Sequence, residues 1–262
     1  MNIDLTGKKA IVCGASKGIG RAAAVELAKL GTSVTILARN EEALAKVKAQ
    51  LDTGKKQVHH ILTGDTAKTA ALKDTVTAHV KKKGPFHILI NNSGGPPAGP
   101  VHTAKEEDFI NVFTQHLIGN HVMMQALLPG MKAEKYGRII NIISTSVKTP
   151  IKGLGVSNTI RGAVASWAKT LSMEVAGDGI TVNNILPGAT DTDRMAEIIS
   201  GKATKTGKSK DDVFAEEIAA IPAGRFGTPE ELAQAIAFLA SPAAAYINGI
   251  NLTVDGGRTG CL

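Results

Sequence analysis

The stretch KAIVCGASKGIGR, residues 9–21, decides the fold of this chain. It begins with a short apolar run that predicts a buried strand, continues through a loop with three glycines, and from Arg21 enters an Ala/Leu-rich helical pattern. Glycines let the backbone turn tightly and approach a pyrophosphate, which then lies at the positive N-terminus of the helix. A plain strand-to-helix turn is the alternative. The strand before, the helix after and the position near the N-terminus favour a dinucleotide site.

Further along the chain, short apolar runs rich in Val and Ile alternate with helical patterns. The predicted strands are KKAIVCG (8–14), SVTILA (33–38), QVHHIL (57–62), HILINN (87–92), GRIINII (137–143) and ITVNNIL (180–186). Strands that are apolar on both sides and separated by helices are typical of a parallel sheet covered on both faces. The sequence therefore predicts a single domain over residues 1–262 with a doubly wound, mostly parallel α/β sheet.

Composition excludes several classes of protein. Of the 262 residues 43% are hydrophobic, enough for a sizeable core, and the net charge of +7 is modest. Aromatic residues make up only 3%, and the lysines are spread among acidic neighbours, so we expect no nucleic-acid partner. Cys13 and Cys261 have neither metal-binding nor CxxC spacing, so no metal site is predicted. Without an apolar signal core or a run of about 18 apolar residues, we expect a cytoplasmic protein with no membrane partner.

A polar stretch at about residues 193–226 interrupts the alternation of strands and helices. It carries Lys202, Lys205, Lys208 and Lys210 and follows a late strand, which predicts a mobile lid over a substrate site. The lysines fit a solvated loop better than they fit recognition of an anionic substrate.

Four motifs together resemble the short-chain dehydrogenase/reductase family. They are the GxxxGxG loop, Asn91-Asn92-Ser93-Gly94 (NNAG in the family), Pro187-Gly188 followed by Thr192, and the tail from GTPEELAQAIAFLAS to Gly257. The resemblance covers nearly the whole chain and is strongest to 3-oxoacyl-[acyl-carrier-protein] reductases. It implies a Rossmann fold of about seven strands, and a homotetramer or dimer formed through the long helices and the C-terminal segment.

The charge at the end of the second strand indicates the cofactor. An NAD site needs a carboxylate there for the ribose hydroxyls, whereas this strand ends in Leu37-Ala38-Arg39. Arg39 and Lys17 would meet a 2′-phosphate, which predicts NADP (NADPH). Asp65 would bind the adenine amino group or, equally, cap the following helix. The full set of predicted cofactor residues is Gly14, Ser16, Lys17, Gly18, Ile19, Gly20, Arg39, Asp65, Thr66, Asn92, Gly94, Pro187, Gly188 and Thr192.

The family's catalytic pattern of Asn, Ser, Tyr and Lys is only partly present. Ser144 matches the serine, but the family's spacing places Ser157 at the tyrosine, Arg161 at the lysine and His116 at the asparagine. Of the two tyrosines, Tyr136 precedes a strand at the wrong end of a parallel sheet and Tyr246 falls in the C-terminal signature. Arg161 can hold the nicotinamide ribose hydroxyls and stabilise an oxyanion, but it cannot relay protons as lysine does.

His116 has a reference pKa near 6.5 and is the best remaining proton donor on chemical grounds, although a buried structural histidine is an equal alternative. Lys148 could also reach the pocket, but a solvent-facing lysine fits better.

Three functions follow. The first is an NADP-dependent oxidoreductase acting on a small carbonyl or alcohol, in which Ser144 and Ser157 hold the substrate oxygen, Arg161 is the electrostatic partner and His116 or water is the acid. The second is a catalytically silent NADP-binding sensor or assembly subunit. The third is a basic scaffold that binds an acidic partner, such as acyl carrier protein, through the lysines of the 193–226 segment.

Overall fold

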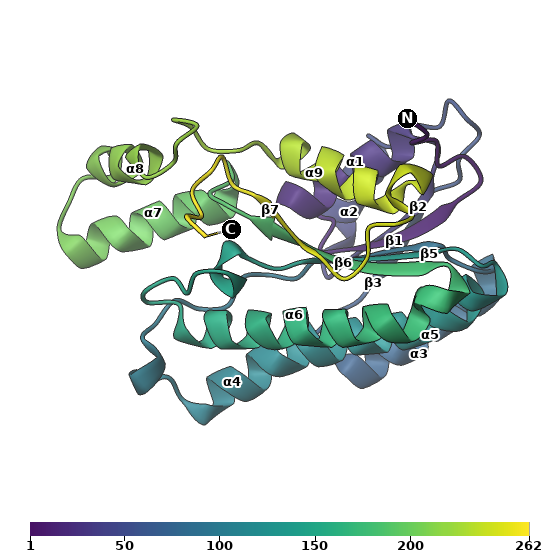
Figure 1. Cartoon of the computed structure of the whole chain (residues 1–262), viewed down its shortest axis with the longest axis horizontal. Coiled ribbons are helices and arrows are strands. Elements are labelled where there is room, and N and C mark those ends of the chain that lie inside the picture. Colours follow the sequence, from purple (N-terminus) through teal and green to yellow (C-terminus); the bar gives the residue numbers. More distant parts are fainter. Residues whose placement is uncertain (262) are drawn as a thin grey trace.

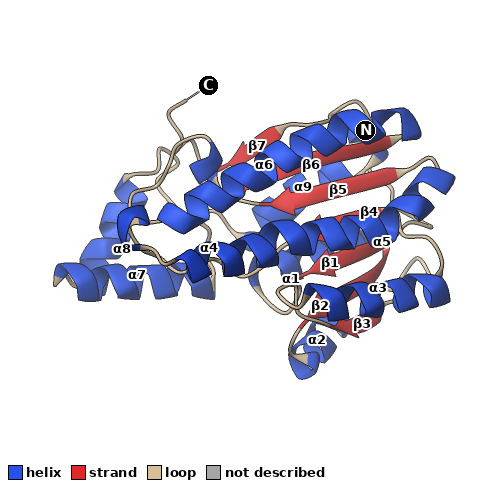
Figure 2. Cartoon of the chain, turned by 90° about the horizontal axis from the view of Figure 1, so that it is seen from below, coloured by secondary structure: helices blue, strands red, loops and turns tan. Residues whose placement is uncertain are grey.

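The computed structural model describes residues 1–261 as a parallel sheet covered by helices on both faces (Figure 1). Within these residues the sheet has seven strands in the order β3-β2-β1-β4-β5-β6-β7, which confirms the predicted doubly wound architecture. The strands are β1 (Lys9–Cys13), β2 (Ser33–Ala38), β3 (His60–Thr63), β4 (Ile88–Asn91), β5 (Gly137–Ile142), β6 (Ile180–Pro187) and β7 (Asn251–Val254). Figure 2 shows the sheet from the side of the long helices.

Helices cover both faces of the sheet. They are α1 (Gly18–Lys29), α2 (Glu41–Lys48), α3 (Thr69–Lys83), α4 (Glu106–Phe113), α5 (Gly119–Ala133), α6 (Gly155–Val175), α7 (Asp193–Thr206), α8 (Lys210–Ala219) and α9 (Pro229–Ala240). Helices α1, α2 and α9 pack on one face of the sheet, and α3, α5 and α6 pack on the other (Figure 1).

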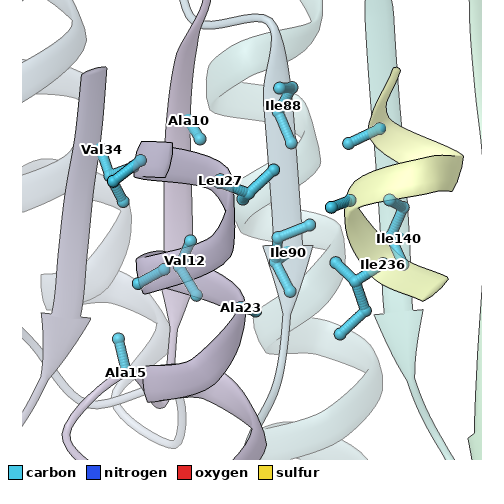
Figure 3. Close-up of a cluster of buried hydrophobic side chains, with 14 of the residues drawn as sticks. Ala10, Val12, Ala15, Ala23, Leu27, Val34, Ile88, Ile90, Ile140 and Ile236 are labelled. Atoms are coloured by element: carbon cyan, nitrogen blue, oxygen red, sulfur yellow. The ribbon is translucent and has the colours of Figure 1, made fainter. Parts of the chain in front are cut away.

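The alternation of side chains along the strands explains why both faces need cover. Val12 of β1 packs with Leu27 of α1 and Ile236 of α9 (Figure 3), whereas its neighbour Ile11 packs with α3, α5 and α6 on the opposite face. All four side chains are fully buried. Strands buried on both faces show as continuous apolar runs, which is the pattern from which the sheet was predicted.

A row of asparagines crosses the second half of the sheet. Asn91, Asn141, Asn184 and Asn251 are register partners on β4, β5, β6 and β7. Each side-chain amide donates to the next side-chain carbonyl, at 2.8, 2.9 and 2.8 Å. Asn91, Asn141 and Asn184 are buried. Buried amides are stable only when they are hydrogen-bonded, so this row favours one alignment of the four strands.

The 193–226 segment differs from the polar loop that the sequence predicts. It forms α7 and α8, which enclose a small cluster of Ile199, Ala203 and Val213 with Phe226. Lys202 and Lys208 pair with Glu216 of α8, and Lys202 also contacts Glu217. These two lysines therefore have carboxylate partners within the segment.

No helix among the described residues is both long enough and apolar enough to cross a lipid bilayer.

Candidate functional site

A cavity of about 810 Å³ lies at the carboxyl ends of the parallel strands. The strand order reverses between β1 and β4, and doubly wound sheets bind ligands outside the carboxyl ends of the strands at such a point. The predicted cofactor residues that line the cavity are Gly14, Ser16, Lys17, Gly18, Ile19, Arg39, Asp65, Thr66, Asn92, Gly94, Pro187, Gly188 and Thr192. The structure thus brings all but one of them to a single site.

The remaining predicted residue, Gly20, is absent from the cavity wall among the described residues. A Cβ atom at Gly20 would collide with the carbonyl oxygen of Gly14, so Gly20 allows α1 to pack closely against the loop. Gly14 adopts a φ of +60°, and a Cβ there would lie 2.6 Å from the carbonyl oxygen of Asn92. Asn92 also donates from Nδ2 to the Gly14 carbonyl oxygen at 3.3 Å. The glycines and Asn92 therefore shape the loop.

The N-terminus of α1 is available to a ligand. No side chain among residues 1–261 caps it, since Lys17 at the N-cap position makes no side-chain capping bond. Uncapped N–H groups and the helix dipole together favour an anion at this point. The loop geometry and its donors thus fit the pyrophosphate of a dinucleotide.

The two predicted phosphate-binding cations lie in different surroundings. Arg39 is exposed at the end of β2 and lines the cavity. Lys17 also lines it, but its Nζ lies 3.1 Å from Asp193 at the start of α7. Both side chains of this pair are exposed, so the pair contributes little and can open for a ligand.

Asp65 follows β3 and is not the N-cap of the next helix. Helix α3 begins at Thr69 with Lys68 as its N-cap, and the Asp65 carboxylate instead accepts a hydrogen bond from the Ala67 amide at 3.0 Å. The capping alternative is therefore wrong. Asp65 and Thr66 both line the cavity, as the cofactor interpretation predicts.

Among the four predicted catalytic residues, Arg161 lines the cavity. It lies on α6 and is buried, and its Nη1 donates to the carbonyl oxygen of Ile142 at 3.1 Å. Burial, and then the positive charge of Arg194, lower the pKa of Arg161 to about 10. The guanidinium is therefore still charged at neutral pH and can stabilise negative charge in the cavity.

Ser144 and Ser157 lie beside the cavity, not in the wall that the described residues form. Ser144 follows Ile143, which does line it, and its Oγ accepts from the Ser146 amide at 3.1 Å. Ser157 is buried on α6, four residues before Arg161 and so on the same face of the helix.

His116 lies behind the cavity in a π-helical turn, Thr114–Ile118, that joins α4 to α5. Its ring is buried and contacts Ser93 Oγ through Nδ1 at 2.8 Å. Burial, and then the charge of Arg161, lower the pKa of His116 to about 3. The imidazole is therefore neutral at physiological pH, which favours water over His116 as the acid. The choice between these two predicted acids stays a prediction.

Ser93 and Arg194 are among the wall residues that the sequence did not predict as functional. Ser93, in the NNSG motif, lines the cavity in front of His116. The family has alanine at this position of the motif, so the serine could have been recognised from the sequence as an additional polar group at the site. Arg194 lines the cavity from α7 and donates from Nη2 to the Pro96 carbonyl oxygen at 3.0 Å. Its position depends on the course of the 193–226 segment, which the sequence did not predict.

The tyrosines lie where the sequence predicts. Tyr136 precedes β5, and its hydroxyl donates to the Ala240 carbonyl oxygen at 2.7 Å, while Tyr246 is fully exposed. Lys148 is exposed in the loop after β5. None of the three belongs to the cavity wall formed by residues 1–261.

Comparison with known proteins identifies the family. A family model described as "Enoyl-(Acyl carrier protein) reductase" matches residues 14–259. The 3-oxoacyl-[acyl-carrier-protein] reductase FabG of Vibrio cholerae is 35% identical over 257 residues, which cover 97% of this chain and 98% of the relative. The chain belongs to the short-chain dehydrogenase/reductase family, in the branch that resembles 3-oxoacyl-[acyl-carrier-protein] reductases.

Solved structures agree with this assignment. L-sorbose reductase from Gluconobacter frateurii, complexed with NADPH and L-sorbose, superposes with a TM-score of 0.93 at 28% identity and full coverage of both chains. YwfH, an NADPH-dependent reductase involved in bacilysin biosynthesis, superposes with a TM-score of 0.92 at 30% identity, covering 97% of this chain and 99% of YwfH. These relatives support binding of a nicotinamide dinucleotide.

Proposed function

We propose that the protein is an NADP-dependent oxidoreductase that interconverts a carbonyl and an alcohol on a small molecule. One observation carries the proposal: a single cavity wall runs from Arg39 and the glycine loop to the polar groups of Ser93 and Arg161. A dinucleotide held at the first end leaves the second end for the reacting oxygen.

The cofactor would be held by groups that the cavity already contains. The uncapped N-terminus of α1 suits its pyrophosphate, Arg39 and Lys17 suit a 2′-phosphate, and Thr192 would meet its nicotinamide end. When bound, NADPH supplies a hydride to the carbonyl carbon. The carbonyl oxygen then becomes an alkoxide and must take up one proton.

Arg161 is the group best suited to stabilise this oxygen. Its buried guanidinium lies in the wall and acts in a medium of low dielectric, where one well-placed donor is worth about 3 kcal/mol in the transition state. Ser93 adds a hydroxyl to the same wall. If Nδ1 of His116 carries the hydrogen, the imidazole donates to Ser93 Oγ and the serine proton is free to meet the substrate.

Ser144 and Ser157 would supply further hydroxyl groups beside the cavity wall. Each is next to a wall residue, Ile143 for Ser144 and Arg161 for Ser157. A serine is too weak an acid to give up its own proton for good. The proton therefore comes from water and passes through hydroxyl groups to the alkoxide.

The test is consumption of NADPH by the pure protein with a panel of ketones and aldehydes. We expect turnover in the wild type and a loss of about 10²-fold in Arg161→Met. The double variant Ser157→Tyr/Arg161→Lys restores the residue types of the family motif and distinguishes the alternative. Activity that appears in this variant and is absent from the wild type would show that the protein is a silent NADP-binding sensor or assembly subunit.

A further inference from the structure

Arg161 is a buried cation without a carboxylate partner among residues 1–261. It is 9% exposed, and none of the ion pairs formed by the described residues includes it. The hydrogen bond that it makes within this part of the chain goes to the Ile142 carbonyl oxygen through Nη1. An uncompensated buried charge is strongly unfavourable, and proteins normally place an anion beside it.

A second guanidinium reaches the same cavity from the other side. Arg194 extends from the first turn of α7, and its Nη2 is fixed to the Pro96 carbonyl oxygen at 3.0 Å. Its positive charge is close enough to lower the pKa of Arg161. Two like charges that line one cavity repel each other, and an anion between them removes that repulsion.

The cavity wall holds four carboxylates, and none of the ion pairs of the described residues joins one of them to Arg161. Asp193 is paired with Lys17 at 3.1 Å, and Glu197 is paired with Nη1 of Arg194 at 3.2 Å. All four side chains of these two pairs are exposed, whereas Arg161 is buried. Asp65 accepts a hydrogen bond from the Ala67 amide, and Asp191 takes part in none of these ion pairs.

The phosphates of the cofactor do not suit this position either. The glycine loop leads into α1, on the face of the sheet opposite to α6, which carries Arg161 (Figure 1). The nicotinamide ring, which must face the substrate, is uncharged when reduced and positive when oxidised. The ribose hydroxyls, which Arg161 can also hold, are uncharged and do not neutralise it. An anion that compensates Arg161 therefore belongs to the substrate.

We propose that Arg161 and Arg194 form an oxyanion-binding subsite, and that the substrate is a carbonyl compound carrying a carboxylate or a phosphate on the same molecule. The inference rests on the proposed function only in taking the bound anion to be the substrate that is reduced. Arginine suits both groups because its planar fork can donate two parallel hydrogen bonds to either. Reduction leaves the anionic group unchanged, so the product is the corresponding hydroxy acid or phosphorylated alcohol.

The first arm of the test compares charged and neutral versions of one carbonyl compound. Pyruvate, acetoacetate and levulinate are paired with their methyl esters, and dihydroxyacetone phosphate is paired with dihydroxyacetone. We expect kcat/KM for NADPH oxidation to be at least tenfold higher for the charged member of one pair. The pair that shows the preference tells carboxylate from phosphate. Equal rates for the charged and neutral members of every pair would overturn the subsite and leave the proposed function intact.

Variants then assign the preference to residues. Arg194→Gln, which changes an exposed side chain, should reduce the charged-to-neutral ratio at least tenfold. Lys73→Met on α3 removes one exposed positive charge outside the cavity wall and should leave both rates unchanged. An equal fall in the ratio in both variants would mean that net charge, and not the subsite, sets the preference.

The second arm does not depend on turnover. The melting temperature is measured with butanoate, butanamide and inorganic phosphate at constant ionic strength, with and without NADP⁺. We expect butanoate or phosphate, and not butanamide, to stabilise the wild type, and the effect to disappear in Arg194→Gln. If this holds but none of the carbonyl compounds is reduced, the anion subsite stands and the proposed function fails. If none of the three probes stabilises the protein, the subsite is wrong.

Discussion

The Oγ atom of Ser93 lies 2.8 Å from Nδ1 of His116, and this contact joins the loop after β4 to the π-helical turn before α5. The serine lines the cavity and the histidine is buried behind it. π-Helical turns within α-helices occur frequently at functional sites, and here the turn carries the imidazole toward the motif loop. The pair gives the cavity a hydroxyl whose orientation is set by a neutral ring.

Removal of the Ser93 hydroxyl should therefore impair reduction. We expect Ser93→Ala to lower kcat by about 10²-fold, the effect of losing one donor to a developing oxyanion, with little change in the Kd for NADPH. Ser166→Ala, at an exposed serine of α6, is the control and should retain full activity. A Ser93→Ala enzyme as active as the wild type would exclude the hydroxyl from the reaction.

Three histidines with lowered pKa values predict how stability depends on pH. Burial is the main cause that lowers the folded-state pKa of His116 to about 3, and of His79 and His87 to about 4. Because the unfolded chain binds protons at about pH 6.5 and the folded state does not, stability is greatest above that pH and falls as the pH decreases toward 4.

Urea unfolding at about pH 7.5 and pH 5 checks this dependence for His116. Between these values the buried ring should account for about 2 kcal/mol of lost stability. His116→Gln, which cannot take up the proton, should lose about that much less than the wild type. Identical acid sensitivity of the two proteins would contradict the lowered pKa.

Arg39 should determine the choice of cofactor. We expect the wild type to bind NADPH at least about tenfold more tightly than NADH, a difference of about 1.4 kcal/mol, and Arg39→Met to remove most of it. Equilibrium titration followed by nicotinamide fluorescence measures both affinities. Lys29→Met, an exposed lysine at the end of α1, provides the charge-matched control. A variant that weakens NADH as much as NADPH would indicate general electrostatics and not recognition of the 2′-phosphate.

The loss of stability on replacing an asparagine of the row across β4 to β7 should depend on where in the row that asparagine lies. Asn141→Ala leaves the buried amide of Asn91 and the buried carbonyl of Asn184 without their partners, which should cost about 3 kcal/mol of unfolding free energy. Asn251→Ala removes one bond at the exposed end, where water can replace it, and should cost about 1 kcal/mol. Denaturant unfolding of the two variants tests the ranking, and equal losses would show that the amides act independently of burial.

The sheet was predictable from the sequence because its strands are apolar on both faces. The start of the edge strand β3 was predicted less accurately. The prediction begins it at Gln57, whereas β3 begins at His60. In residues 57–59, side-chain hydrogen bonds take the place of the backbone hydrogen bonds between strands. The Gln57 side chain donates to the Ala28 carbonyl oxygen at 2.7 Å, and the His59 ring accepts from the Val34 amide at 3.1 Å. Such bonds join positions far apart in the chain and leave no local pattern.

The sequence located one end of the cavity better than the other. Glycine loops, helix N-termini and the charge at a strand end are local features, so it could be predicted from a few neighbouring residues that Gly14 and Arg39 would lie at one site. The pKa of His116 depends on burial and on Arg161, and the position of Arg194 depends on the course of α7. These quantities exist only once the chain is folded.

The asparagine row also fixes how far the loops at the carboxyl ends of β4, β5 and β6 extend relative to one another. Asn91 is followed at once by Asn92 and Ser93, Asn141 by Ile142, and Asn184 precedes Pro187 by three residues. A slip of one residue between any two of these strands would turn an amide to the opposite face and shift one loop by about 3.3 Å against its neighbour. The amides thus keep the loops that follow β4, β5 and β6, which carry Ser93, Ile143 and Pro187 of the cavity wall, at a constant separation.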